Sequence, residues 1–147
     1  MKIASVGALF FASLSLFAAH GFAEEPADAR QTLALSSSER DWVLGDMRGH
    51  LAAITAVVSA LSQGDFETAR KAATENGMIG LAYVPKTIPA KTSDIWKEWM
   101  RNLHMGFDAV ADGLAKHETE QQVLQRVGGL MQNCVACHAT YRIVNAP

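Results

Sequence analysis

The chain has 147 residues, of which 49% are hydrophobic and 19% are charged, with 13 lysines and arginines against 15 aspartates and glutamates. This length suits a single domain with one core, and the formal net charge of −2 excludes the strongly basic surface that binds nucleic acid or an anionic membrane. We therefore expect neither nucleic acid nor a stably associated membrane among its partners.

Residues 1–23 have the pattern of a cleavable secretory signal peptide. Lys2 supplies a positive charge, residues 3–19 form an apolar run, and residues 21–23 are a small-x-small cleavage motif. The run is short for a membrane span, although an uncleaved anchor remains the alternative. We expect cleavage after this motif, which leaves residues 24–147 as one mature domain, exported to the bacterial periplasm.

The mature chain begins with a leader and a long amphipathic helix. Residues 24–35 are polar and rich in alanine, and we expect them to be loosely held. Ser36 and Glu39 have the spacing of a capping box that opens the first helix, which continues to about Gln63. A 3-4-3-4-3 spacing of apolar residues predicts that its inward seam consists of Leu44, Met47, Leu51, Ile54, Val58 and Leu61.

Three further helices are predicted beyond the turn at Gly64. The second covers residues 65–76, and the third covers residues 93–117 after a connection that contains two prolines. Thr119 and Gln122 make another capping box, which opens the last helix. That helix is expected to run to about Tyr141, with an inward seam of Val123, Val127, Leu130, Cys134, Cys137 and Tyr141.

These elements predict an all-α fold. Four helices, three of them with near-heptad apolar spacing, and one long connection are typical of an antiparallel four-helix bundle. The sequence shows no convincing β-strand pattern, internal repeat or low-complexity tract. Both cysteines lie on the predicted inward seam of the last helix, so any group bound to them is expected inside the bundle, near one end.

The most specific motif is Cys134-Val-Ala-Cys137-His138, which contains the only two cysteines of the chain. Cys-x-x-Cys-His is the attachment signature of c-type haem. Two thiols three residues apart on a helix lie on one face, so both can add to the two vinyl groups of one porphyrin. The histidine that follows the second thiol is then held beneath the ring, where it can bind iron as the proximal ligand.

Other uses of two cysteines fit this pattern less well. A disulfide between Cys134 and Cys137 would be strained on a regular helix and would close almost no loop. A structural zinc site needs four ligands, and the two thiols with His138 supply three. A thioredoxin-like redox site would need a βαβ context, which the surrounding sequence lacks. We therefore expect one covalent haem c per chain.

The chain resembles the class II c-type cytochromes, the family of cytochrome c′ and its low-spin relatives. The resemblance rests on the export signal, the four predicted helices and the C-terminal motif followed by Tyr141-Arg142. It implies covalent haem on Cys134 and Cys137, with His138 on the iron. It also implies that the residue on the other side of the iron comes from the first helix, and that its identity decides the function.

Two residues of the first helix compete for the sixth position on the iron. Met47 lies on the predicted seam, and a thioether is a good ligand for haem iron, so we expect Met47 to be the distal ligand. Leu44 lies one turn earlier, and in that position it would leave the iron five-coordinate. His104 on the third helix is a further alternative, although such a histidine is more often a helix-face residue with a hydrogen-bond partner. We interpret His50 and His117 as surface residues.

The expected function follows from the distal residue. A six-coordinate iron with His138 and Met47 is typical of an electron carrier, and we expect redox proteins of the periplasm to be its partners. A five-coordinate iron would instead bind small gases such as nitric oxide or carbon monoxide. A third possibility, peroxidase or nitric oxide reductase activity, would require a distal acid–base pair, for which His104 with Arg101 is the sole candidate. We therefore expect a protein that is not an enzyme and that is a monomer or a homodimer.

Overall fold

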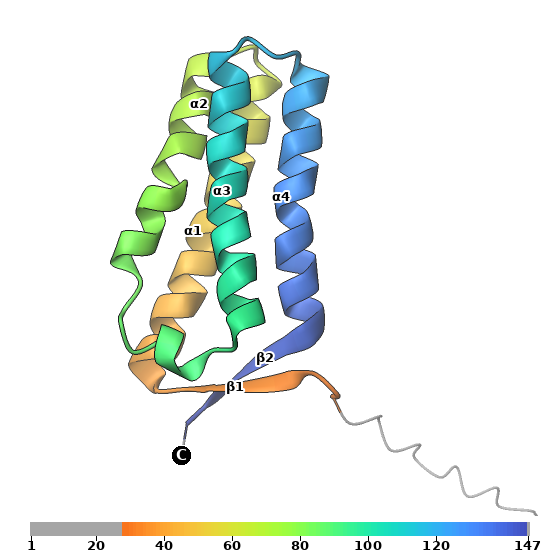
Figure 1. Cartoon of the computed structure of the whole chain (residues 1–147). Coiled ribbons are helices and arrows are strands. Elements are labelled where there is room, and N and C mark those ends of the chain that lie inside the picture. Colours follow the sequence, from red (N-terminus) through yellow and green to blue (C-terminus); the bar gives the residue numbers. More distant parts are fainter. Residues whose placement is uncertain (1–27, 147) are drawn as a thin grey trace, which may run out of the picture.

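The computed structural model describes residues 28–146, so the predicted signal peptide at residues 1–23 lies outside the described residues. Within this range the chain is mostly helical, with four α-helices, two short 3-10 helices and one sheet of two strands (Figure 1). The elements in chain order are β1 (Gln31–Leu35), α1 (Ser37–Leu61), α2 (Phe66–Glu75), η1 (Met78–Tyr83), η2 (Pro89–Lys91), α3 (Asp94–Ala115), α4 (Glu120–Thr140) and β2 (Tyr141–Asn145).

The helix boundaries follow local signals in the sequence. At the start of α1, the Ser36 hydroxyl accepts a hydrogen bond from the Glu39 N–H at 3.4 Å, while the Glu39 carboxylate accepts one from the Ser36 N–H at 2.8 Å. Thr119 and Gln122 form the same reciprocal pair before α4. Both predicted capping boxes are confirmed. Between α1 and α2 the chain turns at Gly64, whose φ of 70° is readily adopted by glycine.

The two strands contradict the expectation of a chain without β structure. β1 and β2 pair in parallel, with Gln31 opposite Tyr141. The prediction of a loosely held leader is wrong for β1, because its Leu33 and Leu35 are buried at one end of the helices. The last helix ends at Thr140, within one residue of the predicted end, and Tyr141 is the first residue of β2. Strand pairing supplies hydrogen-bond partners for the backbone groups of β2, which follows α4 directly.

The four helices lie side by side, and the sheet crosses one end of them (Figure 1). α3 packs mainly against α4 and α2, whereas α1 packs mainly against α2. The core between the helices is apolar and contains Ala53, Ile54, Val57, Ala60, Leu61, Ala69, Ala73, Leu103, Phe107, Val110, Leu114, Val123, Val127 and Leu130. Because Val123, Val127 and Leu130 are all buried, this part of the predicted α4 seam is confirmed.

The predicted seam of α1 is wrong in part. Leu51 and Val58 are 62% and 40% exposed, while Ala53 and Ala60 are buried together with alanines of α2. Small side chains on both helices allow their backbones to approach closely, so α1 turns its alanines rather than these two larger residues toward α2. The apolar spacing that predicted the seam could not reveal this choice.

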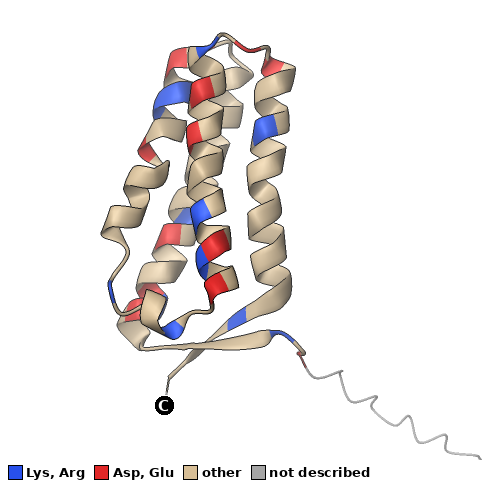
Figure 2. Ribbon diagram, in the orientation of Figure 1, with Lys and Arg blue, Asp and Glu red and all other residues tan. Residues whose placement is uncertain are grey.

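Charged side chains are unevenly distributed over the helices. Figure 2 shows that α4 has no lysine, arginine, aspartate or glutamate in the part that contains the cysteines, which corresponds to residues 127–140. Residues 49–61 of α1 are likewise uncharged. Among the described residues, no helix has the length and apolar character needed to cross a membrane.

Candidate functional site

The last two turns of α4 carry both cysteines and the histidine of the motif. Cys134 and Cys137 share one face of the helix and are half-buried. Cys134 packs against the core between the helices, and Cys137 packs against the apolar cluster at the sheet end. Burial raises the pKa of each thiol, so both are protonated at neutral pH. The expectation that both cysteines face inward is confirmed.

Both thiols and His138 line one cavity of about 350 Å³ between α1, α3 and α4. This volume falls within the range of roughly 300–1,000 Å³ that is typical of small-molecule and cofactor sites. The walls are mainly apolar and aromatic, and they consist of Trp42, Val43, Leu44, Asp46, Met47, Arg48, His50, Leu51, Ile54, Trp96, Trp99, Met100, Leu103, Met131, Asn133 and the three motif residues. The chain thus brings its thiols and an imidazole to one apolar space.

Leu44 and Met47 both line this cavity from α1. The start of α1 and the end of α4 lie at the same end of the molecule, next to the sheet (Figure 1). With a rise of about 1.5 Å per residue, Leu44 lies about 10 Å and Met47 about 15 Å from the start of α1, whereas His138 lies about 3 Å from the end of α4. Leu44 is therefore nearer than Met47 to the sheet end of the molecule, where α4 ends just after His138.

A second hollow of about 280 Å³ adjoins the cavity at the sheet end and carries three arginines, Arg30, Arg40 and Arg142. Asp28 lies 2.8 Å from Arg30 and 3.9 Å from Arg142, and its hydrogen bonds with Arg30 lower the pKa of the Asp28 carboxyl to about 2. The Nε of Arg142 is buried, and no residue of the described chain accepts a hydrogen bond from it. Both spaces are lined by Leu44, Met47, Trp96, Cys137 and His138.

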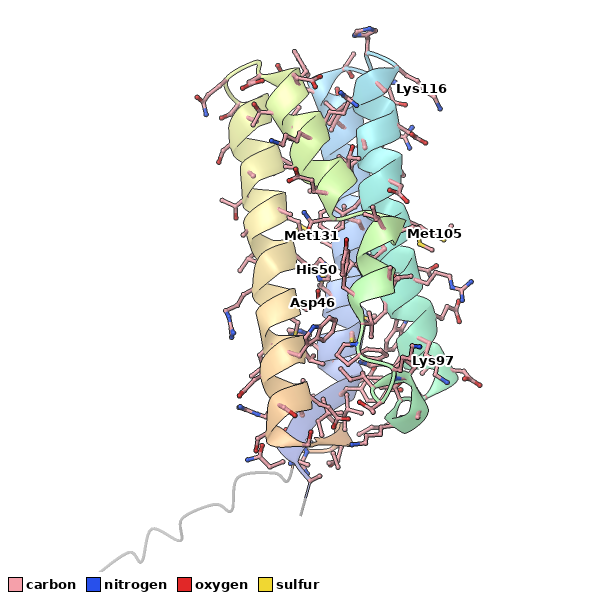
Figure 3. The ribbon with its side chains drawn as sticks, turned by 90° about the vertical axis from the view of Figure 1, so that its left-hand side faces the viewer. Asp46, His50, Lys97, Met105, Lys116 and Met131 are labelled. Atoms are coloured by element: carbon pink, nitrogen blue, oxygen red, sulfur yellow. The ribbon has the colours of Figure 1, made fainter. Side chains whose placement is uncertain are left out.

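The interpretation of His50 as a surface residue is wrong. Its ring is buried at 6% exposure, and Figure 3 shows His50 and Asp46 pointing from α1 into the space between the helices. The His50 Nδ1 lies 3.7 Å from the Asp46 carboxylate, yet burial is the larger effect and lowers the pKa of His50. His50 was missed because it follows Arg48 and Gly49, and this local sequence gives no sign that the histidine is buried.

His104 is buried but is absent from the residues that line the cavity. Its Nδ1 lies 2.9 Å from the Asn76 carbonyl oxygen and 3.0 Å from that of Gly77, so Nδ1–H donates to the end of α2. The expectation that His104 has a hydrogen-bond partner is confirmed. The structure does not bring Arg101 to it as an acid–base pair, because the Arg101 side chain is exposed. His117 is exposed, as predicted.

No sequence pattern indicated that Arg30 belongs to this region. Arg30 lies in the predicted leader, and only the pairing of β1 with β2 carries it beside the end of α4.

Two methionines of α3 and α4 lie differently with respect to the cavity. The exposed Met105 points away from the helices, whereas Met131 lies beside the cavity (Figure 3). Within residues 28–146, no group of three or more histidine, cysteine, aspartate or glutamate side chains is arranged to hold a bare metal ion.

No protein-family model, curated protein or solved structure matches this chain.

Proposed function

We propose that the chain is a class II c-type cytochrome of the periplasm, in which Cys134 and Cys137 hold one haem covalently and His138 binds its iron. The four helices would then form the antiparallel bundle expected for such a protein. The observation that carries the proposal is the convergence of two thiols and an imidazole, adjacent in sequence, on a single apolar cavity. Each thiol would add across one vinyl group, with sulfur bonded to one vinyl carbon and the thiol proton transferred to the other.

The residues around the cavity fit a haem in shape and charge. A haem is a flat apolar ring with two carboxylates on one edge, and Trp42, Trp96 and Trp99 offer large apolar surfaces to such a ring. In the adjoining hollow at the sheet end, Arg142 has a buried Nε without an acceptor in the described chain. Guanidinium groups bind carboxylates well, so this side suits the propionates.

Electron transfer is the function that these residues support best. A bound haem supplies an iron that gains and loses one electron. Met47 would bind this iron with its thioether, which favours the ferrous state, and the apolar walls would exclude water. Among the described residues, His50 is the other histidine that lines the cavity, and its Nδ1 lies 3.7 Å from the Asp46 carboxylate. Redox partners would dock transiently, through a small interface.

Gas binding is the second candidate, and one observation favours it. On α1, Leu44 lies three residues, about 5 Å, nearer than Met47 to the sheet end of the molecule, where α4 ends just after His138. If Leu44 faces the iron, no side chain completes its coordination, and nitric oxide or carbon monoxide can bind there. In that arrangement Met47 only packs against the cluster at the sheet end.

The spin state of the ferric protein distinguishes the two candidates. With Met47 on the iron, the ferric protein is low-spin and has a sulfur-to-iron charge-transfer band in the near infrared. Met47→Ala then abolishes both signals, whereas the control Met105→Ala, on the exposed surface, leaves them unchanged. A high-spin ferric spectrum with ready uptake of carbon monoxide by the reduced protein would replace electron transfer with gas binding.

A further inference from the structure

The end of α4 would be expected to fray, because the last four carbonyl groups of a helix have no partner within it. His138 lies in this last turn, only two residues before the helix ends at Thr140. A histidine on a fraying turn would be a poor ligand, since its ring would sample many orientations. The surrounding chain holds this turn in a way that the covalent attachment of the cysteines does not explain.

Arg30 holds the backbone of His138 directly. Its Nη1 donates a hydrogen bond to the His138 carbonyl oxygen at 3.2 Å, across 108 residues of sequence. Asp28 fixes the guanidinium in turn, with Oδ1 3.0 Å from Nε and Oδ2 2.8 Å from Nη2. A cation at a helix C-terminus also interacts favourably with the helix dipole. The Asp28 carboxylate thus holds one side of the Arg30 guanidinium, and the other side caps the C-terminus of α4.

The strand that follows Arg30 holds the chain just beyond His138. β1 pairs with β2 from Gln31 opposite Tyr141 onward, and at the far end the Ala146 N–H donates to the Leu35 carbonyl oxygen at 2.7 Å. The Tyr141 N–H in turn donates to the Cys137 carbonyl oxygen and so closes the last turn. These bonds fix the residues on the C-terminal side of the motif.

Buried side chains anchor the strand to the helices. Leu33 and Leu35 are 5% and 0% exposed, and they pack in one cluster with Trp96. Cys137 and Tyr141 pack against the same cluster. The segment from Arg30 to Leu35, here called the N-terminal strap, is therefore continuous with the core that supports the motif.

We propose that the N-terminal strap positions His138 for the iron, with Arg30 as the positioning residue. This inference rests on the proposed haem attachment. The thioethers of Cys134 and Cys137 keep the haem on the chain whether or not the strap is paired. The strap fixes only the last turn of α4, and with it the orientation of the His138 ring. Loosening the strap therefore changes iron ligation without releasing haem.

The test uses the purified haem protein in its ferric state with cyanide on the iron, which gives a low-spin complex whichever residue is distal. The spread of the haem methyl proton resonances reports the orientation of the proximal imidazole plane. Amide hydrogen exchange of the last turn of α4 reports its opening. We compare Arg30→Gln, Arg30→Lys and Leu33→Ala with two controls, Arg70→Gln at an exposed ion pair and Leu61→Ala in the core away from the cavity.

We expect Arg30→Gln and Leu33→Ala to shift the methyl resonances. For Arg30→Gln, amide exchange of the last turn should become about tenfold faster, as the loss of one hydrogen bond from a charged group implies. Arg30→Lys, which keeps a cationic donor, should restore most of the wild-type pattern. Leu61→Ala should lower the stability of the whole protein and leave the methyl pattern unchanged.

Two results would overturn the inference while leaving the haem proposal intact. One is a wild-type methyl pattern in both Arg30→Gln and Leu33→Ala. The other is an equal change in Leu61→Ala, which would mean that the pattern follows global stability rather than the strap. A wild-type protein without covalent haem would instead overturn the proposed function, and the inference with it.

Discussion

Cys134 and Cys137 have the same role in the motif but different surroundings in the structure. Cys134 faces the core between the helices and Cys137 faces the cluster at the sheet end. Each replacement by serine should leave one thioether and one unreacted vinyl group. Because that vinyl group stays conjugated with the ring, the absorption bands of the reduced pyridine complex should move to longer wavelength.

Replacing both cysteines should leave haem that organic solvent extracts from the denatured protein. The measurement is haem retention after acid–acetone treatment, together with the spectrum of the pyridine complex. Val135→Ser is the matched control, since Val135 lies within the motif but is 62% exposed. Full retention of haem by the double variant would show that the cysteines are not the points of attachment.

Glu39 gives a second test at the residue scale, through the pH dependence of stability. The carboxylate is buried, accepts a hydrogen bond from the Lys91 Nζ at 2.7 Å and caps α1 through Ser36. These bonds, with that of Lys91 the largest, lower the pKa of Glu39 from 4.5 to about 2. A lowered pKa stabilises the folded state fully above pH 4.5, and this stabilisation is lost as the pH falls toward 2.

Glu39→Gln should therefore lower the melting temperature at neutral pH and flatten its decline between pH 4.5 and 2. Thermal unfolding followed by circular dichroism measures both effects. Glu98→Gln removes the same charge from an exposed position on α3 and should keep the wild-type profile. An unchanged profile in Glu39→Gln would mean that the pair with Lys91 contributes nothing to the acid sensitivity.

At the scale of elements, α3 and α4 approach each other at Gly106. A Cβ at this position would lie 2.5 Å from the Leu130 Cβ and 3.3 Å from its Cα, so Gly106→Ala must push the helices apart. Overpacking of this kind costs about 1–3 kcal/mol. Gly129→Ala on α4 meets nothing within 4 Å and should instead stabilise by up to about 1 kcal/mol, because alanine is the better helix former.

Urea unfolding of the two glycine variants measures the difference, with the midpoint lowered for Gly106→Ala and raised for Gly129→Ala. Stabilisation by both substitutions would show that helix propensity outweighs packing at Gly106. The α3–α4 contact would then be looser than in the structure. The wall of the cavity, to which both helices contribute, would be looser as well.

The elements also show what could be predicted from the sequence and what could not. The helices and their capping boxes depend on residues three or four apart, such as Ser36 with Glu39, and these predictions are confirmed. The sheet pairs Gln31 with Tyr141, and because these residues are far apart in the sequence, no local pattern predicts it. The rotation of α1 depends on alanines of another helix, which is why Leu51 and Val58 were misplaced.

The whole molecule brings together features that lie far apart in the sequence. The motif identified the thiols and His138, but the cavity also needs α1 and α3, and the arginines around the second hollow come from α1, β2 and the residue just before β1. The uncharged part of α4 lies beside this region (Figure 2). His50 and Arg30 show that burial and charge around a site are set by tertiary packing, which a linear pattern does not contain.

The proposed function depends on the covalent binding of a haem by Cys134 and Cys137. The most direct test is the intact mass and visible spectrum of the protein purified from the periplasm of a host that carries the cytochrome c maturation machinery. The expected mass is that of residues 24–147 plus one haem, and the absorption bands of the haem should persist after denaturation. A colourless protein with the mass of its polypeptide alone would contradict the proposed function.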